Sequence, residues 1–96
     1  MKIKGLAKSG NVYLDGVPLF AEKSQGYLNL NPDGFAWGDE SNGSAQLALA
    51  ILLEYYGTPI DAIENYKDFQ RRFIVPLEQG KDFEIEILAW KSQSPN

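Results

Sequence analysis

The residues whose chemistry could serve a ligand gather in one loop, from Gly38 to Ser44, which leads into an apolar segment. Glycines and small hydroxyl residues at the start of a helix leave backbone N–H groups free to attract an anion. Phosphate loops add a lysine at this point, whereas this sequence carries the carboxylates Asp39 and Glu40. Two adjacent carboxylates without further oxygen ligands are also a weak metal signature. We therefore predict a capped turn that enters a helix, with no metal and no cofactor.

Two side chains beside this loop allow a structural and a functional interpretation. Gln46 is polar within an otherwise apolar helix, and a buried amide without hydrogen-bond partners costs about 1–3 kcal/mol. We predict that it ties the Trp37–Gly38 loop to the start of the helix, while the alternative is that it contacts a ligand there. Trp37 is predicted in the core or at its rim, with stacking on a ligand as the alternative. The candidate contacts for a ligand or a partner are Trp37, Gly43, Ser44 and Gln46.

The composition removes many kinds of catalysis. The 96 residues include no cysteine and no histidine, which excludes thiolate nucleophiles, imidazole bases and the metal sites that need either group. Nine basic against thirteen acidic side chains give a net charge of −4, which disfavours binding to nucleic acid phosphates. Glu84 and Glu86 fall on one face of an alternating segment and are predicted to be solvated, with no chemistry assigned. We expect a protein that is not an enzyme.

The elements that position these residues begin with antiparallel strands. The segment Ile3–Ala7 is followed by a turn signal, and the Asp15-Gly16 pair between two apolar runs predicts a tight hairpin. Pro18 has no N–H group for a strand ladder, so its strand should lie at an edge of the sheet. The sequence therefore predicts a three-stranded meander.

Three further features of this region are weaker. Tyr27–Leu30 alternates in polarity and predicts a short additional strand, and Asn31–Gly34 predicts a turn. Lys2, Lys4 and Lys8 alternate as the exposed side chains of an edge strand do. We therefore place these lysines on a solvated edge.

Two helices are predicted after the meander. The first spans about Ser44–Tyr56, is apolar on all sides and so should be buried, and ends at Gly57. The second begins with Thr58 as N-cap, Pro59 in the first turn and Asp61 reaching back in a capping box, and Pro76 ends it near Ile74 or Val75. It is amphipathic, with an apolar stripe of Ala62, Ile63, Tyr66, Phe69, Phe73 and Leu77.

A last strand closes the predicted fold. Asp82–Ile87 alternates with a period of two, whereas Leu88–Trp90 could extend the strand or form a short terminal helix. The polar residues 91–96 are predicted to fray. We expect one α+β domain over residues 1–96, in two layers. Its N-terminal antiparallel meander and C-terminal strand pack on one buried and one amphipathic helix.

The sequence shows no sign of membrane insertion or export. Its longest wholly apolar run, Leu47–Leu53, is far below the roughly 20 residues that a membrane span needs. No apolar signal region follows the first residues. We therefore expect a cytoplasmic protein that contacts no membrane.

The stretch from Phe35 to Leu52 resembles an uncharacterised family of short phage, prophage and plasmid proteins. The shared pattern is an aromatic-x-Trp-Gly segment at Phe35–Gly38, a Gly/Ser loop, and Ala-Gln-Leu-Ala-Leu-Ala-Ile-Leu at Ala45–Leu52. Weaker similarities lie elsewhere, at Asp15, Gly16, Leu19, Ala62, Tyr66, Phe69 and Trp90. Asp39–Asn42 replaces a less charged loop, and Ser44 replaces a usual proline. The resemblance implies a mobile genetic element as the setting, and no mechanism.

Two functions fit these observations. The first is a small non-enzymatic module that binds a host protein or another copy of itself, and a homodimer through a sheet edge or an aromatic patch fits this function. The second is a small-ligand protein that holds a nucleotide or anion at the N-terminus of the buried helix, with Trp37 as a stacking wall.

Overall fold

The computed structural model describes residues 1–90, so the predicted fraying of residues 91–96 lies outside the described part. The chain runs through β1 (Lys2–Gly5), β2 (Val12–Leu14), β3 (Val17–Leu19) and α1 (Glu22–Tyr27). It continues through α2 (Asn42–Tyr56), α3 (Pro59–Phe69), the π-helix η1 (Gln70–Ile74) and β4 (Phe83–Glu86). The predicted α+β class, with the meander joined by a C-terminal strand, is confirmed.

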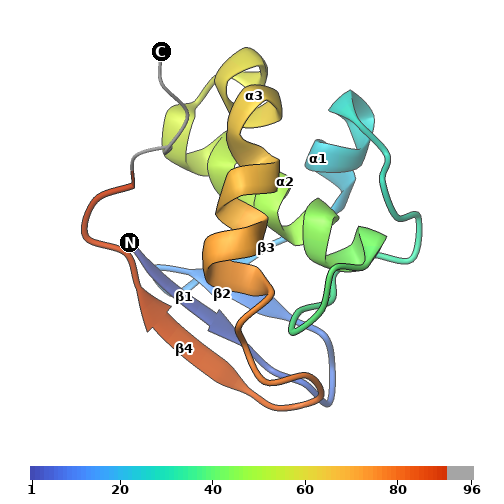
Figure 1. Ribbon diagram of the computed structural model, residues 1–96, viewed down its shortest axis with the longest axis vertical. Coiled ribbons are helices and arrows are strands. Elements are labelled where there is room, and N and C mark those ends of the chain that lie inside the picture. The colour runs from blue at the N-terminus through green and yellow to red at the C-terminus, as the bar shows by residue number, and fades with distance from the viewer. Residues whose placement is uncertain (91–96) are drawn as a thin grey trace.

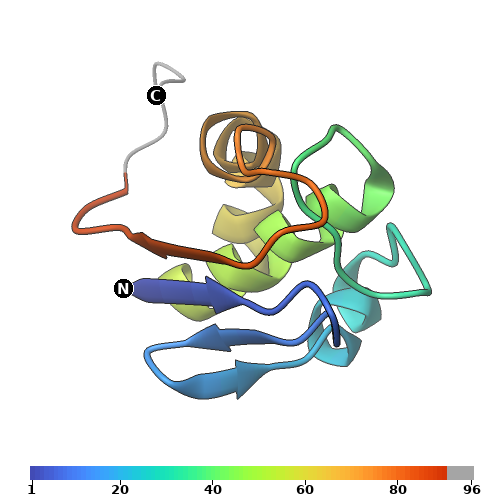
Figure 2. The same cartoon turned by 90° about the horizontal axis from the view of Figure 1, so that it is seen from below.

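The four strands form one antiparallel sheet in the order β3-β2-β1-β4. The Asp15-Gly16 turn has positive φ at both residues, 49° and 81°, as the predicted hairpin requires. Pro18 lies in β3 at one edge of the sheet, as predicted. Figures 1 and 2 show α2 and α3 on the same side of the sheet, so the structure has two layers.

The prediction that the N-terminal lysines mark a sheet edge is wrong. β1 lies between β2 and β4, and Lys2 and Lys4 stand opposite Glu86 and Glu84 in the register. The prediction that Lys2 and Lys4 are exposed on one face of a strand is confirmed. Which strand lies at the edge depends on the pairing of β1 with β4, which is distant in sequence. Opposite charges facing each other across two strands stabilise this outer face modestly.

The prediction of a strand at Tyr27–Leu30 is also wrong. Tyr27 ends the short helix α1, and residues 28–30 form no regular element. A helix of this length is marginal by itself. Ser24 within it is buried and donates its hydroxyl to the Ala21 carbonyl at 2.8 Å. Gln46 of α2 donates to the Ser24 hydroxyl and to the Leu28 carbonyl, so tertiary contact, which the weak alternation could not reveal, fixes this segment.

The two predicted helices are present with small changes. α2 begins two residues earlier than expected, with Ser41 as its N-cap, and ends at Gly57 in the left-handed conformation at φ 76°. At the start of α3, Thr58 donates its hydroxyl to the Asp61 carboxylate at 2.7 Å and does not cap a backbone N–H group. Helical structure continues to Ile74, as Pro76 predicts, although its last five residues are a π-helix.

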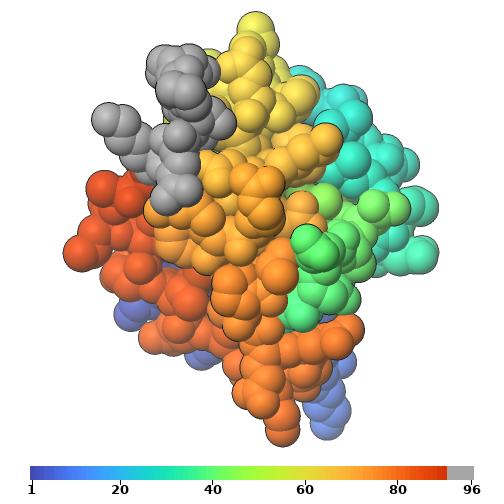
Figure 3. Space-filling model, viewed as in Figure 1, coloured from blue at the N-terminus to red at the C-terminus, as the bar shows by residue number. Residues whose placement is uncertain are grey.

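The core lies between α2, α3 and the inner face of the sheet. It is lined by Ile3, Val12, Leu14, Trp37, Leu47, Leu49, Ile51, Leu52, Ala62, Tyr66, Phe69, Ile74, Phe83, Ile87 and Trp90. Ile63 departs from the predicted stripe of α3 and is exposed. In Figure 3, α3 and η1 (yellow to orange) cover the middle of the face, beside the green segment that leads into α2. The prediction that the central helix is buried is confirmed.

Residues 87–90 form neither a strand nor a helix, so both alternatives for Leu88–Trp90 are wrong. Leu88 is 92% exposed, whereas Trp90 is 6% exposed and packs edge-on against Phe69. The indole N–H group of Trp90 donates to the Tyr56 hydroxyl at 2.8 Å. The chain thus leaves the sheet to place this ring against the helices. Within residues 1–90, no helix has both the length and the apolar character to cross a membrane.

Candidate functional site

The N-terminus of α2 is closed by groups of the protein itself. The Ser41 hydroxyl accepts from the backbone N–H of Ser44 and donates to the Asp39 carboxylate, which also accepts the Ser44 hydroxyl at 2.7 Å. The side chain of Gln79 donates to the second carboxylate oxygen at 3.1 Å. These hydroxyl groups hold the pKa of Asp39 below its ordinary value, against an opposing effect of burial. The position that an anion would take is therefore filled by a carboxylate of the chain.

The glycines of the loop are needed for close packing. Gly38 has φ 85°, and its N–H donates to the Ile74 carbonyl at 3.0 Å. A Cβ atom at Gly38 would lie 2.6 Å from the backbone of Gln79, and one at Gly43 would lie 2.8 Å from the Cβ of Ala36. The loop is thereby pressed against the segment that follows η1 on one side and against the Ala36 segment on the other.

Trp37 is part of this packing. Its ring is 6% exposed and meets Phe83 edge-on, with 4.9 Å between the ring centroids. Its indole N–H donates to the Lys81 carbonyl at 2.8 Å. The predicted position at the core is confirmed, and the ring offers no open face on which a base could stack.

Gln46 is fully buried and all four of its hydrogen bonds are made within the chain. Its amide oxygen accepts from the N–H groups of Leu30 at 2.7 Å and Asn31 at 2.9 Å. Its amide nitrogen donates to the Ser24 hydroxyl at 2.8 Å and to the Leu28 carbonyl at 3.1 Å. The side chain therefore ties the segment from α1 to Asn31 onto α2, and not the Trp37–Gly38 loop as predicted.

Gly43, Ser44 and Gln46 lie in the first turns of α2, whereas Trp37 packs against β4, and all four are buried. Across residues 1–90, no buried side-chain nitrogen or oxygen lacks a hydrogen-bond partner. The same part of the chain holds no group of three or more Asp and Glu residues able to bind a metal ion. At the start of α2, the polar side chains of Ser44 and Gln46 are thus already hydrogen-bonded within the chain.

A hollow does lie outside this packing, beside the first turn of α2. It encloses about 440 Å³ and is lined by Leu30, Glu40, Asn42, Ala45, Tyr66, Lys67, Gln70, Arg71 and Val75. Two of its side chains are cationic, but Arg71 bonds to Asp68 at 3.2 Å and Glu40 opposes an anion. Its charge pattern therefore gives little preference for a phosphate.

Exposed apolar side chains also lie around β3, which the sequence analysis did not single out. Val17 is 64% exposed and Phe20 is 67% exposed. Two hollows flank the strand and share Pro18, Leu19 and Glu54, and we call them together the β3 groove. The run of four apolar residues from Val17 to Phe20, on a strand expected at an edge, was the signal that could have located it.

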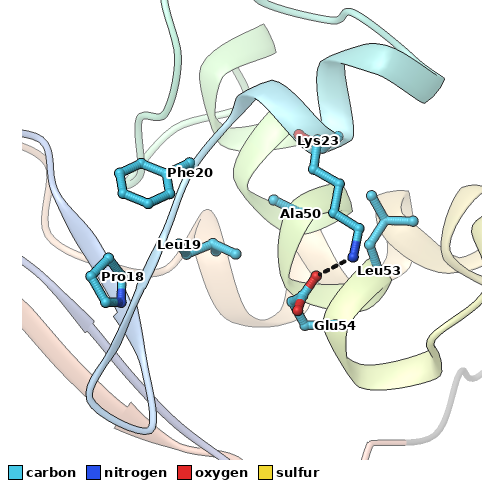
Figure 4. Close-up of a pocket in the computed structure, with 8 residues that line it drawn as sticks. Pro18, Leu19, Phe20, Lys23, Ala50, Leu53 and Glu54 are labelled. Carbon is cyan, nitrogen blue, oxygen red and sulfur yellow. Dashed lines mark hydrogen bonds and ion pairs between the residues drawn. The ribbon is translucent and has the colours of Figure 1, made fainter.

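The two hollows of the β3 groove have different walls. One encloses about 190 Å³ between β3, α1 and α2, and Figure 4 shows Leu19, Ala50 and Leu53 among the residues that line it. Beside them the ammonium of Lys23 meets the carboxylate of Glu54 at 3.0 Å. The other hollow encloses about 320 Å³ and is lined by Met1, Leu14, Asp15, Val17, Pro18, Leu19 and Glu54.

The fold defines a small α+β protein in which the segment from Trp37 to Gln46 packs around the start of the buried helix α2. The chain belongs to the Family of unknown function (DUF6166), whose model matches residues 4–93. The expected membership in an uncharacterised family is thereby confirmed. No curated protein and no solved structure matches the chain.

Proposed function

We propose that this protein is a small non-enzymatic module that binds another protein through the β3 groove. The observation that carries the proposal is the pair of exposed apolar side chains, Val17 and Phe20, which stand on either side of Pro18 and Leu19. Contiguous apolar surface that stays exposed in a folded protein marks sites of association. The loop before α2 supports the same conclusion, because the Asp39 carboxylate bonded to Ser41 and Ser44 disfavours an anion at the start of that helix.

The setting of this function is part of the proposal. The resemblance to short phage, prophage and plasmid proteins supports a gene of a mobile element, whose product acts on a host protein or on another copy of itself. The acidic balance of the chain favours a protein partner over nucleic acid. The absence of cysteine from the sequence supports action in the reducing cytoplasm.

Affinity capture with matched variants tests the proposal. The full chain is immobilised and exposed to lysate of the host cell, next to a Val17→Ser/Phe20→Ser variant and an Ile60→Ser control. Ile60 is equally exposed, at 70%, but lies on α3 away from the groove. We expect the same protein to be retained by the wild type and the control and lost from the double variant. If the wild type, the double variant and the control retain the protein equally, the partner does not bind through the β3 groove.

The alternative function, a nucleotide or anion site at the start of α2, has one supporting feature, the hollow lined by Lys67 and Arg71. A thermal-shift series with mono-, di- and cyclic nucleotides and with inorganic phosphate tests it. A ligand that binds the folded state raises the melting temperature in proportion to the logarithm of its concentration. We expect no rise with any of them, and a rise that Lys67→Ala abolishes would favour the alternative.

A further inference from the structure

The partner that suits the β3 groove can be deduced from the backbone of its strand. The N–H of Asp15 donates to the Lys2 carbonyl at 2.8 Å, and the Asn11 carbonyl accepts from Leu6 at 2.9 Å. Odd positions of β2 therefore direct their backbone groups to β1, and this includes Tyr13. In an antiparallel pair, hydrogen-bonded and non-hydrogen-bonded positions alternate. Pro18, opposite Tyr13, consequently turns its nitrogen and carbonyl to the free edge of the sheet.

This orientation makes β3 unsuitable for adding a strand. Proline has no N–H group, so a strand laid along β3 would lack a donor at the middle residue of this three-residue element. Proline on an edge strand is one of the devices by which sheets avoid edge-to-edge pairing. A partner must therefore bind through side chains that enter the groove.

The shape of the groove fits single apolar side chains. Its two hollows enclose about 190 and about 320 Å³, at or below the lower end of the roughly 300–1,000 Å³ typical of small-molecule sites. Leu19 lines both of them, together with Leu53 in one and Leu14 in the other. A helix presents apolar residues at three- and four-residue spacing, which would place successive anchors in neighbouring hollows.

The charges around the groove are mainly negative. A third hollow, lined in part by Asp33, shares Pro18 and Leu19 with the first two. The charged side chains that line the three are the carboxylates of Asp15, Asp33 and Glu54 and the ammonium of Lys23. Met1 also lines one hollow, and its N-terminal ammonium is paired with Glu86 at 3.0 Å. The Lys23 ammonium is already paired with Glu54, in an exposed ion pair of the kind that contributes only about 0–1 kcal/mol. The Asp15 carboxylate accepts the backbone N–H of Lys2 at 2.8 Å through one oxygen. A cation on a partner could therefore pair with Glu54 and with the other oxygen of Asp15 without breaking a strong ion pair.

We propose that the β3 groove binds an amphipathic helical segment of a partner protein, whose apolar ridge is flanked by a lysine or arginine that pairs with Glu54 and Asp15. The inference rests on the proposed function and adds the chemistry of the partner. A second copy of the chain suits the groove less well, because a two-fold interface would set the same carboxylate-rich rim against itself.

Selection from a library of displayed peptides tests this inference. The full-length wild type is the bait, and peptides that also bind the Val17→Ser/Phe20→Ser variant are removed. We expect enriched peptides with apolar residues at three- and four-residue spacing and with lysine or arginine beside them. Their helical circular dichroism should rise on binding to the protein.

Charge variants supply the second measurement. The dissociation constant of a synthetic selected peptide is measured with the wild type, Glu54→Gln, Asp15→Asn and the control Glu64→Gln, which removes an exposed carboxylate on α3. We expect each of the first two to weaken binding about two- to fivefold, as the loss of an exposed ion pair does. The control should leave binding unchanged, and raised salt should shrink the difference between variants.

The outcomes separate the two proposals. Peptides that bind the groove but lack basic residues, or that alternate with a period of two, overturn the inference and leave the proposed function standing. Failure to enrich any peptide dependent on Val17 and Phe20 counts against the proposed function itself. A dimer in sedimentation equilibrium that the double variant abolishes would identify a second copy as the occupant and overturn the inference.

Discussion

Replacing Gln46 by leucine tests whether the hydrogen bonds of its side chain hold the segment from α1 to Asn31 against α2. The leucine has a similar size but no hydrogen-bonding group, and it leaves no room for a water molecule to replace the amide. Four hydrogen bonds are lost, to the groups of Ser24, Leu28, Leu30 and Asn31. The expected result is a large loss of stability without a change of fold.

The size of the loss follows from what each former partner can still do. The Ser24 hydroxyl keeps its bond to Ala21, and the Leu30 N–H retains a contact to the Leu28 carbonyl at 3.1 Å. The N–H of Asn31 has no further partner among the bonds described, so it becomes an orphaned donor at a cost of about 1–3 kcal/mol. The three other bonds contribute about 0.5–1.5 kcal/mol each. After allowance for the added apolar burial, we expect a loss of about 3–5 kcal/mol out of a total of about 5–14 kcal/mol.

The assay is urea unfolding followed by circular dichroism, combined with amide hydrogen exchange. The free energy of unfolding should fall with an unchanged m value. Exchange at Leu30 and Asn31 should accelerate relative to the amides in the middle of α2, because their acceptor has been removed. A loss below about 1 kcal/mol together with unaltered exchange at both amides would refute the reasoning, since each bond would then be weaker than measured series indicate.

Gln46→Glu provides a matched test of the donors alone. The new carboxyl can still accept from Leu30 and Asn31, but its ionised form has no proton for the Leu28 carbonyl. The N–H groups of Leu30 and Asn31 favour the ionised form, but we expect full burial to outweigh them and to raise the folded-state pKa above the unfolded value of about 4.3. Relative to the wild type at each pH, this variant should be most stable below that value and lose stability as pH rises through the folded-state pKa. A pH-independent difference would contradict this account.

Three further predictions concern the close packing at Gly38, the buried ring of Trp90 and the hydrogen bonds to Asp39. Gly38→Ala should destabilise the protein by about 2–4 kcal/mol in urea unfolding, because the residue is left-handed and its new Cβ atom would meet backbone atoms. Gly10→Ala, which is left-handed but has open space, should cost only about 1 kcal/mol. Equal costs for the two variants would show that the close contact at Gly38 does not matter. Trp90→Ala should cost about 3–5 kcal/mol and Leu88→Ala less than about 0.5 kcal/mol, despite their proximity in sequence, and thermal unfolding of both checks this. Because hydrogen bonds from Ser41 and Ser44 lower the pKa of Asp39, the stability they confer is present above the unfolded value near 3.8 and is lost as pH falls through the folded-state pKa. Ser44→Ala should make the fall in unfolding free energy between about pH 5 and about pH 2 shallower, and an unchanged slope would speak against the interaction.

Local signals were sufficient for most of the fold. The Asp15-Gly16 turn, the proline of β3, the apolar α2 and its terminal Gly57 each carry a short-range cause that acts within a few residues. Their positions were accordingly predicted to within about two residues. α1 was missed because its six residues are held by Ser24 and Gln46 and show no helical periodicity.

The sequence selected Trp37, Gly43, Ser44 and Gln46 as candidate contacts for a ligand or a partner. The structure shows that each takes part in packing or hydrogen bonding within the chain. The target of Gln46 was predicted incorrectly, because an amide can reach any backbone segment that tertiary folding brings near. The β3 groove was missed because exposure depends on what covers a strand, and alternation within the strand does not contain that information.

The sequence by itself determined the class of fold, the absence of thiol and imidazole chemistry, the hairpin and the burial of the central helix, since these follow from residue type and spacing along the chain. Only the tertiary structure decided that β1 is an inner strand, that Asp39 fills the end of α2, and that Val17 and Phe20 remain open to solvent. The physical reason is that strand order, charge pairing and exposure are relations between segments far apart in sequence. Their energies exist only once the core has brought those segments together.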